Sequence, residues 1–115
     1  MPQSILVIED DLDAGHLMTW TLSAVGHRAQ LVHSRDDALF HLRTSAFDIV
    51  LMDYGMPGMT AEAFLEMVRA KWPATKVVLI TAADGAKPIA EKLSTDGVIT
   101  KPFDPVVLSK KLASI

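Results

Sequence analysis

Carboxylate side chains follow two short apolar runs of this chain. Ile5–Ile8 runs into the acidic stretch Glu9–Asp11, and Ile49–Met52 runs into Asp53. A continuous apolar run of this length is typical of a strand that is buried on both faces. A carboxylate is costly to bury there without a partner. Asp53 is therefore either a turn residue of the Gly- and Pro-containing loop that follows it, or a functional group.

Two further apolar runs end in groups that complement a carboxylate. Lys76–Thr81 ends in a hydroxyl, and Val98–Thr100 is followed by Lys101. If these run ends meet, the carboxylates would repel one another unless a cation neutralised them, and oxygen ligands of this kind suit Mg²⁺. Such a site would handle a phosphoryl group, whose transfer demands charge neutralisation and positioning. The acidic stretch alone would also be explained as the first turn of a helix.

The rest of the sequence predicts a fold that brings these run ends together. Short apolar runs alternate with helical patterns, which indicates parallel strands joined by right-handed crossovers. We predict one α/β domain over residues 1–115, a three-layer sandwich whose five-stranded parallel sheet has the flavodoxin-like order 2-1-3-4-5. Functional groups then belong beyond the carboxyl ends of the inner strands. The second strand, at the edge, ends in His33 and Ser34 and offers no comparable group.

The predicted elements follow from these patterns. Strands are expected at Ile5–Ile8, Ala29–His33, Ile49–Met52, Lys76–Thr81 and Val98–Thr100. Helices are expected from about Asp13 to Val25, after Ser34, between Thr60 and Pro73, from Pro88 towards Leu93, and after a cap at Asp104. The first helix should bury Leu17, Met18, Leu22 and Val25, with Gly26 at its C-terminal cap.

The composition excludes several classes of protein. The chain has 11 Lys and Arg against 14 Asp and Glu, a net charge of −3 and no basic run longer than two residues, so no direct nucleic-acid or membrane partner is expected. It has no cysteine, no secretory signal pattern and no apolar run of membrane-spanning length. We therefore expect a soluble domain with a cytoplasmic location.

Four segments in this order, ILVIEDD, DIVLMDYGMPGM, VVLITA and ITKPF, resemble the receiver domain of two-component response regulators. The likeness covers nearly the whole chain. It implies a phosphorelay module that accepts a phosphoryl group from the phosphohistidine of a sensor histidine kinase or a histidine phosphotransfer protein. It also implies an output partner or domain that the sequence does not identify, and chemistry limited to the module's own phosphorylation and dephosphorylation rather than an enzyme.

The resemblance implies roles for the acidic residues. Asp53 matches the phosphoacceptor, whose carboxylate attacks the phosphorus. Glu9 and Asp10 match the acidic pair that organises Mg²⁺, with Asp10 as a direct ligand and Glu9 acting through water. Gly55 matches the residue whose backbone carbonyl completes the metal shell. Asp11 matches no ligand and is interpreted as a helix-start residue.

The same resemblance covers the other two strand ends. Thr81 matches the hydroxyl and Lys101 the ammonium that bind the phosphoryl group, and the bond between Lys101 and Pro102 matches one that is cis in the family. Val98 departs from the family, which commonly has an aromatic residue there that reports phosphorylation. The segment between Thr81 and Lys101 is also about two residues shorter than usual, so the output surface is expected to differ while the chemistry is kept.

Two other functions remain open on the sequence. One is a phosphorylation-independent interaction module that keeps only the receiver shape, against which the retained Asp53, Asp10, Thr81 and Lys101 argue. The other is an aspartate-nucleophile phosphohydrolase of the haloacid-dehalogenase kind. Such an enzyme needs a second aspartate two positions after the nucleophile, where this chain has Gly55.

Overall fold

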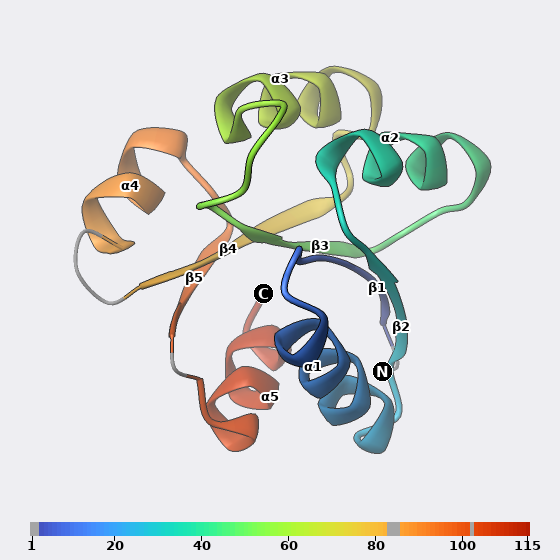
Figure 1. The fold of residues 1–115 in the computed structure, drawn as a ribbon, viewed down its shortest axis with the longest axis vertical. Coiled ribbons are helices and arrows are strands. Elements are labelled where there is room, and N and C mark those ends of the chain that lie inside the picture. Colours follow the sequence, from blue (N-terminus) through green and yellow to red (C-terminus); the bar gives the residue numbers. More distant parts are fainter. Residues whose placement is uncertain (1–2, 83–85, 102) are drawn as a thin grey trace.

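The computed structural model describes residues 3–82, 86–101 and 103–115. These residues form one parallel sheet in the order β2-β1-β3-β4-β5, with helices on both faces (Figure 1). The strands are β1 Ser4–Ile8, β2 Arg28–Val32, β3 Ile49–Asp53, β4 Lys76–Ala82 and β5 Gly97–Lys101. The helices are α1 Leu12–Ala24, α2 Arg35–Thr44, α3 Ala61–Lys71, α4 Ala86–Leu93 and α5 Pro105–Ala113. The predicted fold class and strand order are confirmed.

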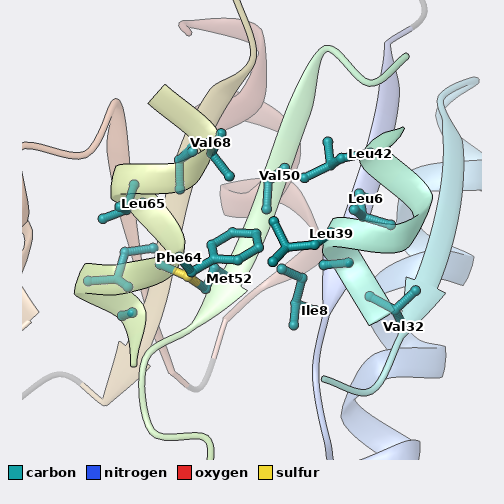
Figure 2. Packing of buried hydrophobic residues seen from close by; sticks show 14 of the residues in the cluster. Leu6, Ile8, Val32, Leu39, Leu42, Val50, Met52, Phe64, Leu65 and Val68 are labelled. Carbon is teal, nitrogen blue, oxygen red and sulfur yellow. The ribbon is translucent and has the colours of Figure 1, made fainter. Parts of the chain in front are cut away.

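The core lies in two layers because the side chains of each inner strand alternate between the two faces of the sheet. Helices α1 and α5 cover one face, and α2, α3 and α4 cover the other (Figure 1). Leu6 and Ile8 of β1 point towards α2 and α3, into the cluster that also contains Phe64 (Figure 2). Ile5 and Val7 point the other way, into the cluster beneath α1 and α5. Burial on both faces is the reason that these strands read as unbroken apolar runs.

Capping residues fix where the helices begin. The carboxylate of Asp11 accepts hydrogen bonds from the backbone N–H groups of Asp13 and Ala14, so its predicted role as a helix-start residue is confirmed. Ser34, Thr60 and Asp104 cap α2, α3 and α5 in the same way. Each cap satisfies a backbone donor that has no partner within its helix. Asp11, Ser34 and Asp104 follow the ends of β1, β2 and β5 within three residues, so these helix starts lie next to the carboxyl ends of the strands, where the candidate residues are.

The inward face of α1 differs from the prediction. Met18 and Leu22 are fully buried as expected, but Leu17 and Val25 are 49% and 52% exposed. The buried stripe contains Gly15 instead, because α1 packs against Leu31 of β2 so closely that a Cβ at position 15 would lie 2.8 Å from a Leu31 methyl carbon. Met18 follows Gly15 by three residues and Leu22 follows Met18 by four, so the three lie on one stripe of the helix.

The remaining differences are at element ends. Helix α4 begins at Ala86, before the predicted Pro88, because proline is tolerated anywhere in the first turn of a helix. Each of the five strands differs from its predicted range by one residue at one or both ends. The predicted cis bond before Pro102 lies outside the described residues, as does the 83–85 part of the loop before α4. Of the described helices, none is both long and apolar enough to cross a membrane.

Candidate functional site

Three carboxylates meet at the carboxyl ends of β1 and β3. Ile8 of β1 is in register with Met52 of β3, so the residues that follow, Glu9 and Asp53, emerge at the same level of the sheet. Together with Asp10 they each offer an oxygen within 4.8 Å of the others. Glu9 is fully buried and Asp53 is 9% exposed, whereas Asp10 faces solvent. The structure thus brings together the acidic residues that the sequence singled out.

Lys101 links two of these carboxylates. Its Nζ donates to Oδ2 of Asp53 at 2.9 Å and to Oε1 of Glu9 at 3.1 Å. Lys101 ends β5, where it pairs with Ala82 of β4, and Thr81 is therefore the preceding residue on the neighbouring strand. Thr81 is 9% exposed, and Ile80 before it is in register with Asp53. The predicted hydroxyl of Thr81 and ammonium of Lys101 therefore come from β4 and β5, which lie on the same side of β3.

The protonation of the cluster is set by burial and by Lys101. Burial, followed by the neighbouring Asp53 carboxylate, raises the pKa of Glu9 to about 7, against the opposing pull of Lys101. Burial also opposes ionisation of Asp53, but the interactions with Glu9 and Lys101 outweigh it and lower the pKa of Asp53 below its usual value. Burial disfavours the Lys101 cation, yet its two carboxylate partners raise the pKa of Lys101. Near neutral pH, Asp53 and Lys101 are charged and Glu9 is poised to gain or lose a proton.

The donor set fits a hard divalent cation. Oε2 of Glu9 is buried and accepts no hydrogen bond from the described residues. A buried carboxylate oxygen without a hydrogen-bond partner is rare unless it contacts an ion or a water molecule. All the converging ligand atoms are carboxylate oxygens, which Mg²⁺ prefers over the nitrogen and sulfur ligands that other metals take. Glu9, Asp10 and Asp53 are thus the residues that could hold Mg²⁺.

The backbone after β3 holds Asp53 in place. The N–H of Tyr54 donates to the carbonyl of Ile80 at 3.0 Å, which extends the pairing with β4 past the aspartate. The N–H of Gly55 donates to Oδ1 of Asp53 at 3.3 Å, while Lys101 takes Oδ2. Each oxygen of the Asp53 carboxylate therefore has a fixed donor, which orients the group.

The end of β2 contributes more than the sequence indicated. A ring nitrogen of His33 lies 3.1 Å from the backbone carbonyl oxygen of Glu9, a contact that supports the backbone and adds no group to the cluster of Glu9, Asp10 and Asp53. Arg35, the first residue of α2, is 2% exposed and donates to backbone carbonyls of the loop after β3. A sequence signal for Arg35 did exist. A cation in the first helical turn opposes the helix dipole, so it needs another reason to be there.

The comparisons with known proteins agree with this geometry. Residues 5–113 match the family described as the response regulator receiver domain. Among curated relatives, the chain is 31% identical to the response regulator protein FleR of Pseudomonas aeruginosa over 106 residues, 90% of this chain and 22% of FleR. It is 28% identical to the sensory transduction protein RegX3 of Mycolicibacterium smegmatis over 97% of this chain and 50% of RegX3. The chain thus spans half or less of the length of these two relatives.

Solved structures give the same result for the fold. The receiver domain from Methylobacillus flagellatus superposes with a TM-score of 0.85 at 28% identity, over 99% of this chain and 98% of that one. The chemotaxis protein CheY4 of Vibrio cholerae reaches 0.88 at 24% identity, over 100% of this chain and 99% of that one, a likeness of fold. With the family match over almost its whole length, the chain belongs to the receiver domain family of two-component response regulators.

Proposed function

We propose that this domain accepts a phosphoryl group on Asp53 in a Mg²⁺-dependent reaction with the phosphohistidine of a sensor histidine kinase or a histidine phosphotransfer protein. The observation that carries the proposal is the Asp53 carboxylate at the end of β3, oriented by Lys101 and Gly55 and within 4.8 Å of two further carboxylates. Ionised, oriented and 9% exposed, it has the properties of a nucleophile that a phosphodonor can reach.

The phosphoryl transfer requires only the phosphohistidine donor, Asp53 and a proton from solvent. An oxygen of Asp53 attacks the phosphorus, a phosphorus–oxygen bond forms, and the phosphorus–nitrogen bond to the donor imidazole breaks. The imidazole leaves with the electron pair of the broken bond and takes up a proton from solvent. The lowered pKa of Asp53 keeps its carboxylate ionised for this attack. Because the product is an acyl phosphate on Asp53 of the domain itself, each domain molecule accepts one phosphoryl group, and the domain is no enzyme towards other molecules.

The neighbouring residues divide the charge of the phosphoryl group. Bound Mg²⁺ would be held by Asp10, Asp53 and the carbonyl of Gly55, with Glu9 acting through water, and would neutralise the carboxylates and a phosphoryl oxygen. Lys101, whose Nζ lies 2.9 Å from Asp53, would bind another phosphoryl oxygen, and Thr81 on the neighbouring strand would donate its hydroxyl. The acyl phosphate then switches the interactions of an output partner, in a cytoplasmic pathway.

Intact-mass spectrometry after incubation with acetyl phosphate or phosphoramidate and Mg²⁺ tests the proposal. The wild type should gain one phosphoryl group and Asp53→Asn none. Asp48→Asn is the matched control, since Asp48 precedes the opposite end of the same strand, and it should react like the wild type. Equal labelling of wild type and Asp53→Asn refutes the site, and no labelling of the wild type favours a phosphorylation-independent interaction module.

A further inference from the structure

Arg35 is bound to the loop that follows the phosphoacceptor strand. Its Nη2 donates to the carbonyls of Asp53 at 2.8 Å and Tyr54 at 3.0 Å. Its Nη1 donates to the carbonyls of Met59 at 2.7 Å and Met56 at 3.4 Å. One side chain of α2 thus holds the loop from its first residue to the residue before Thr60, the cap of α3.

This placement has costs that must be offset by a gain elsewhere. Arg35 is 2% exposed, and burial lowers the pKa of its guanidinium. It occupies the first turn of α2, where the helix dipole disfavours a cation. Within the described part of the chain it pairs with no carboxylate, and its Nε has no hydrogen-bond partner. Four charge-assisted bonds to carbonyls are its compensation, so the loop conformation and the arginine depend on each other.

The pattern of the bonded carbonyls bears on the metal site. Arg35 binds the carbonyls of Asp53 and Tyr54 before Gly55 and that of Met56 after it, but not that of Gly55 itself. The Gly55 N–H meanwhile points back to Oδ1 of Asp53. With its neighbours' carbonyls held towards Arg35, the peptide groups around Gly55 have few orientations left. The carbonyl of Gly55 is the one in this stretch that the guanidinium leaves available to a cation.

We propose that Arg35 is a positioning residue for the metal site: by fixing the peptide groups around Gly55, it presets the loop for Mg²⁺ binding beside Asp53. This inference rests on the proposed function, because it assumes that Mg²⁺ binds at Glu9, Asp10 and Asp53. Residues outside the coordination shell that orient a ligand commonly change metal affinity by about 10- to 100-fold when replaced.

Mg²⁺ titrations of the wild type, Arg35→Met and Arg35→Lys, followed by NMR, test the inference. The loss of positioning and the loss of the positive charge are expected to change the Mg²⁺ affinity of Arg35→Met in opposite directions. Removing a cation near a divalent metal site would by itself tighten Mg²⁺ binding. Loss of positioning weakens it, so the dissociation constant of Arg35→Met should rise by about tenfold or more. Arg35→Lys keeps the charge but lacks the planar fork that spans several carbonyls, and it should also bind Mg²⁺ more weakly than the wild type.

A second measurement separates positioning from general stability. In metal-free protein, the amides of Gly55 and Met56 should exchange faster with solvent in both variants, while those of β1 and β3 should not. Arg69→Met is the matched control, because Arg69 also donates to two backbone carbonyls, those of Leu93 and Ser94 at the end of α4, away from the carboxylates. It should lower the free energy of unfolding slightly and leave Mg²⁺ affinity unchanged.

The outcomes are distinguishable. Wild-type affinity in Arg35→Lys or in folded Arg35→Met, or tighter binding in Arg35→Met, overturns the inference and leaves the proposed function standing. If Arg35→Met does not fold, Arg35→Lys decides alone. If the wild type itself binds no Mg²⁺, the proposed function fails, and the inference falls with it.

Discussion

Replacing Glu9 with glutamine should change how the stability of the metal-free protein depends on pH. Glu9 is fully buried, and its pKa is raised from 4.5 to about 7. Between these pH values the native state keeps a proton that the unfolded state has released, so the free energy of unfolding falls as pH rises through this window. At about 1.4 kcal/mol per pH unit, the loss by pH 8 is on the order of 3 kcal/mol.

The other coupled groups of the site act outside this window. The lowered pKa of Asp53 contributes stability that is present at neutral pH and lost only as pH falls below the ordinary value of 3.8. The raised pKa of Lys101 contributes stability that is lost only above its ordinary value of 10.5. The change between pH 4.5 and pH 8 that Glu9→Gln abolishes is therefore assigned to Glu9.

Urea unfolding in EDTA, followed by circular dichroism at several pH values, measures the effect. The unfolding free energy of Glu9→Gln minus that of the wild type should rise by about 3 kcal/mol from pH 4.5 to pH 8. Glu66→Gln, at an exposed position of α3, should follow the wild type. Saturating Mg²⁺ should stabilise the wild type at pH 8 more than the variant. Parallel curves for the wild type and Glu9→Gln would refute the buried, high-pKa carboxylate and the electrostatics built on it.

Further substitutions test other parts of the account. Asp10→Ala should weaken Mg²⁺ binding by more than about tenfold in a metal titration. Asp11→Ala should leave the Mg²⁺ affinity unchanged and lower the free energy of unfolding by about 1 kcal/mol, because the cap of α1 is lost. Equal losses of affinity in the two variants would show that Asp10 has been wrongly chosen over Asp11 as the metal ligand. With beryllofluoride and Mg²⁺, NMR should show large amide shifts near Asp53 and over residues 82–87 and smaller ones at Val98, because a valine has no ring to reorient. Thr81→Ala should reduce the shifts over residues 82–87. A rotamer change at Val98 as the dominant event would contradict transmission of the signal through this loop. Phe64→Ala should lower the free energy of unfolding in urea by about 3 to 5 kcal/mol, since the ring is fully buried between α3 and the sheet. A loss below about 1 kcal/mol would show that the core there is loosely packed.

The sequence was sufficient for the sheet and for the carboxylates because both depend on local patterns. Strands buried on both faces leave unbroken apolar runs, and parallel topology places the residues after Ile8 and Met52 side by side. The cap residues were also readable, since Ser34 and Asp104 act on donors within three residues of themselves.

Features that depend on distant contacts were not readable in the same way. Arg35 acquires its role from carbonyls 18 to 24 residues away, which no periodicity reports. The exposure of Leu17 follows from the close approach of Gly15 to Leu31, which only the docking of α1 on β2 determines. The high pKa of Glu9 likewise reflects complete burial beside Asp53, although the sequence places Glu9 at a strand end like its exposed neighbour Asp10.

The chemical identity of the modified residue distinguishes an acyl phosphate on Asp53 from a phosphoryl group at any other position. After reaction with phosphoramidate and Mg²⁺, borohydride reduces an aspartyl phosphate to homoserine, and peptide mapping locates it in the sequence. We predict homoserine at position 53 in the wild type, only when both donor and Mg²⁺ were present. Homoserine at Asp10 or another carboxylate, or a phosphoryl group retained on a histidine such as His33, would contradict the assignment of Asp53 as the phosphoacceptor.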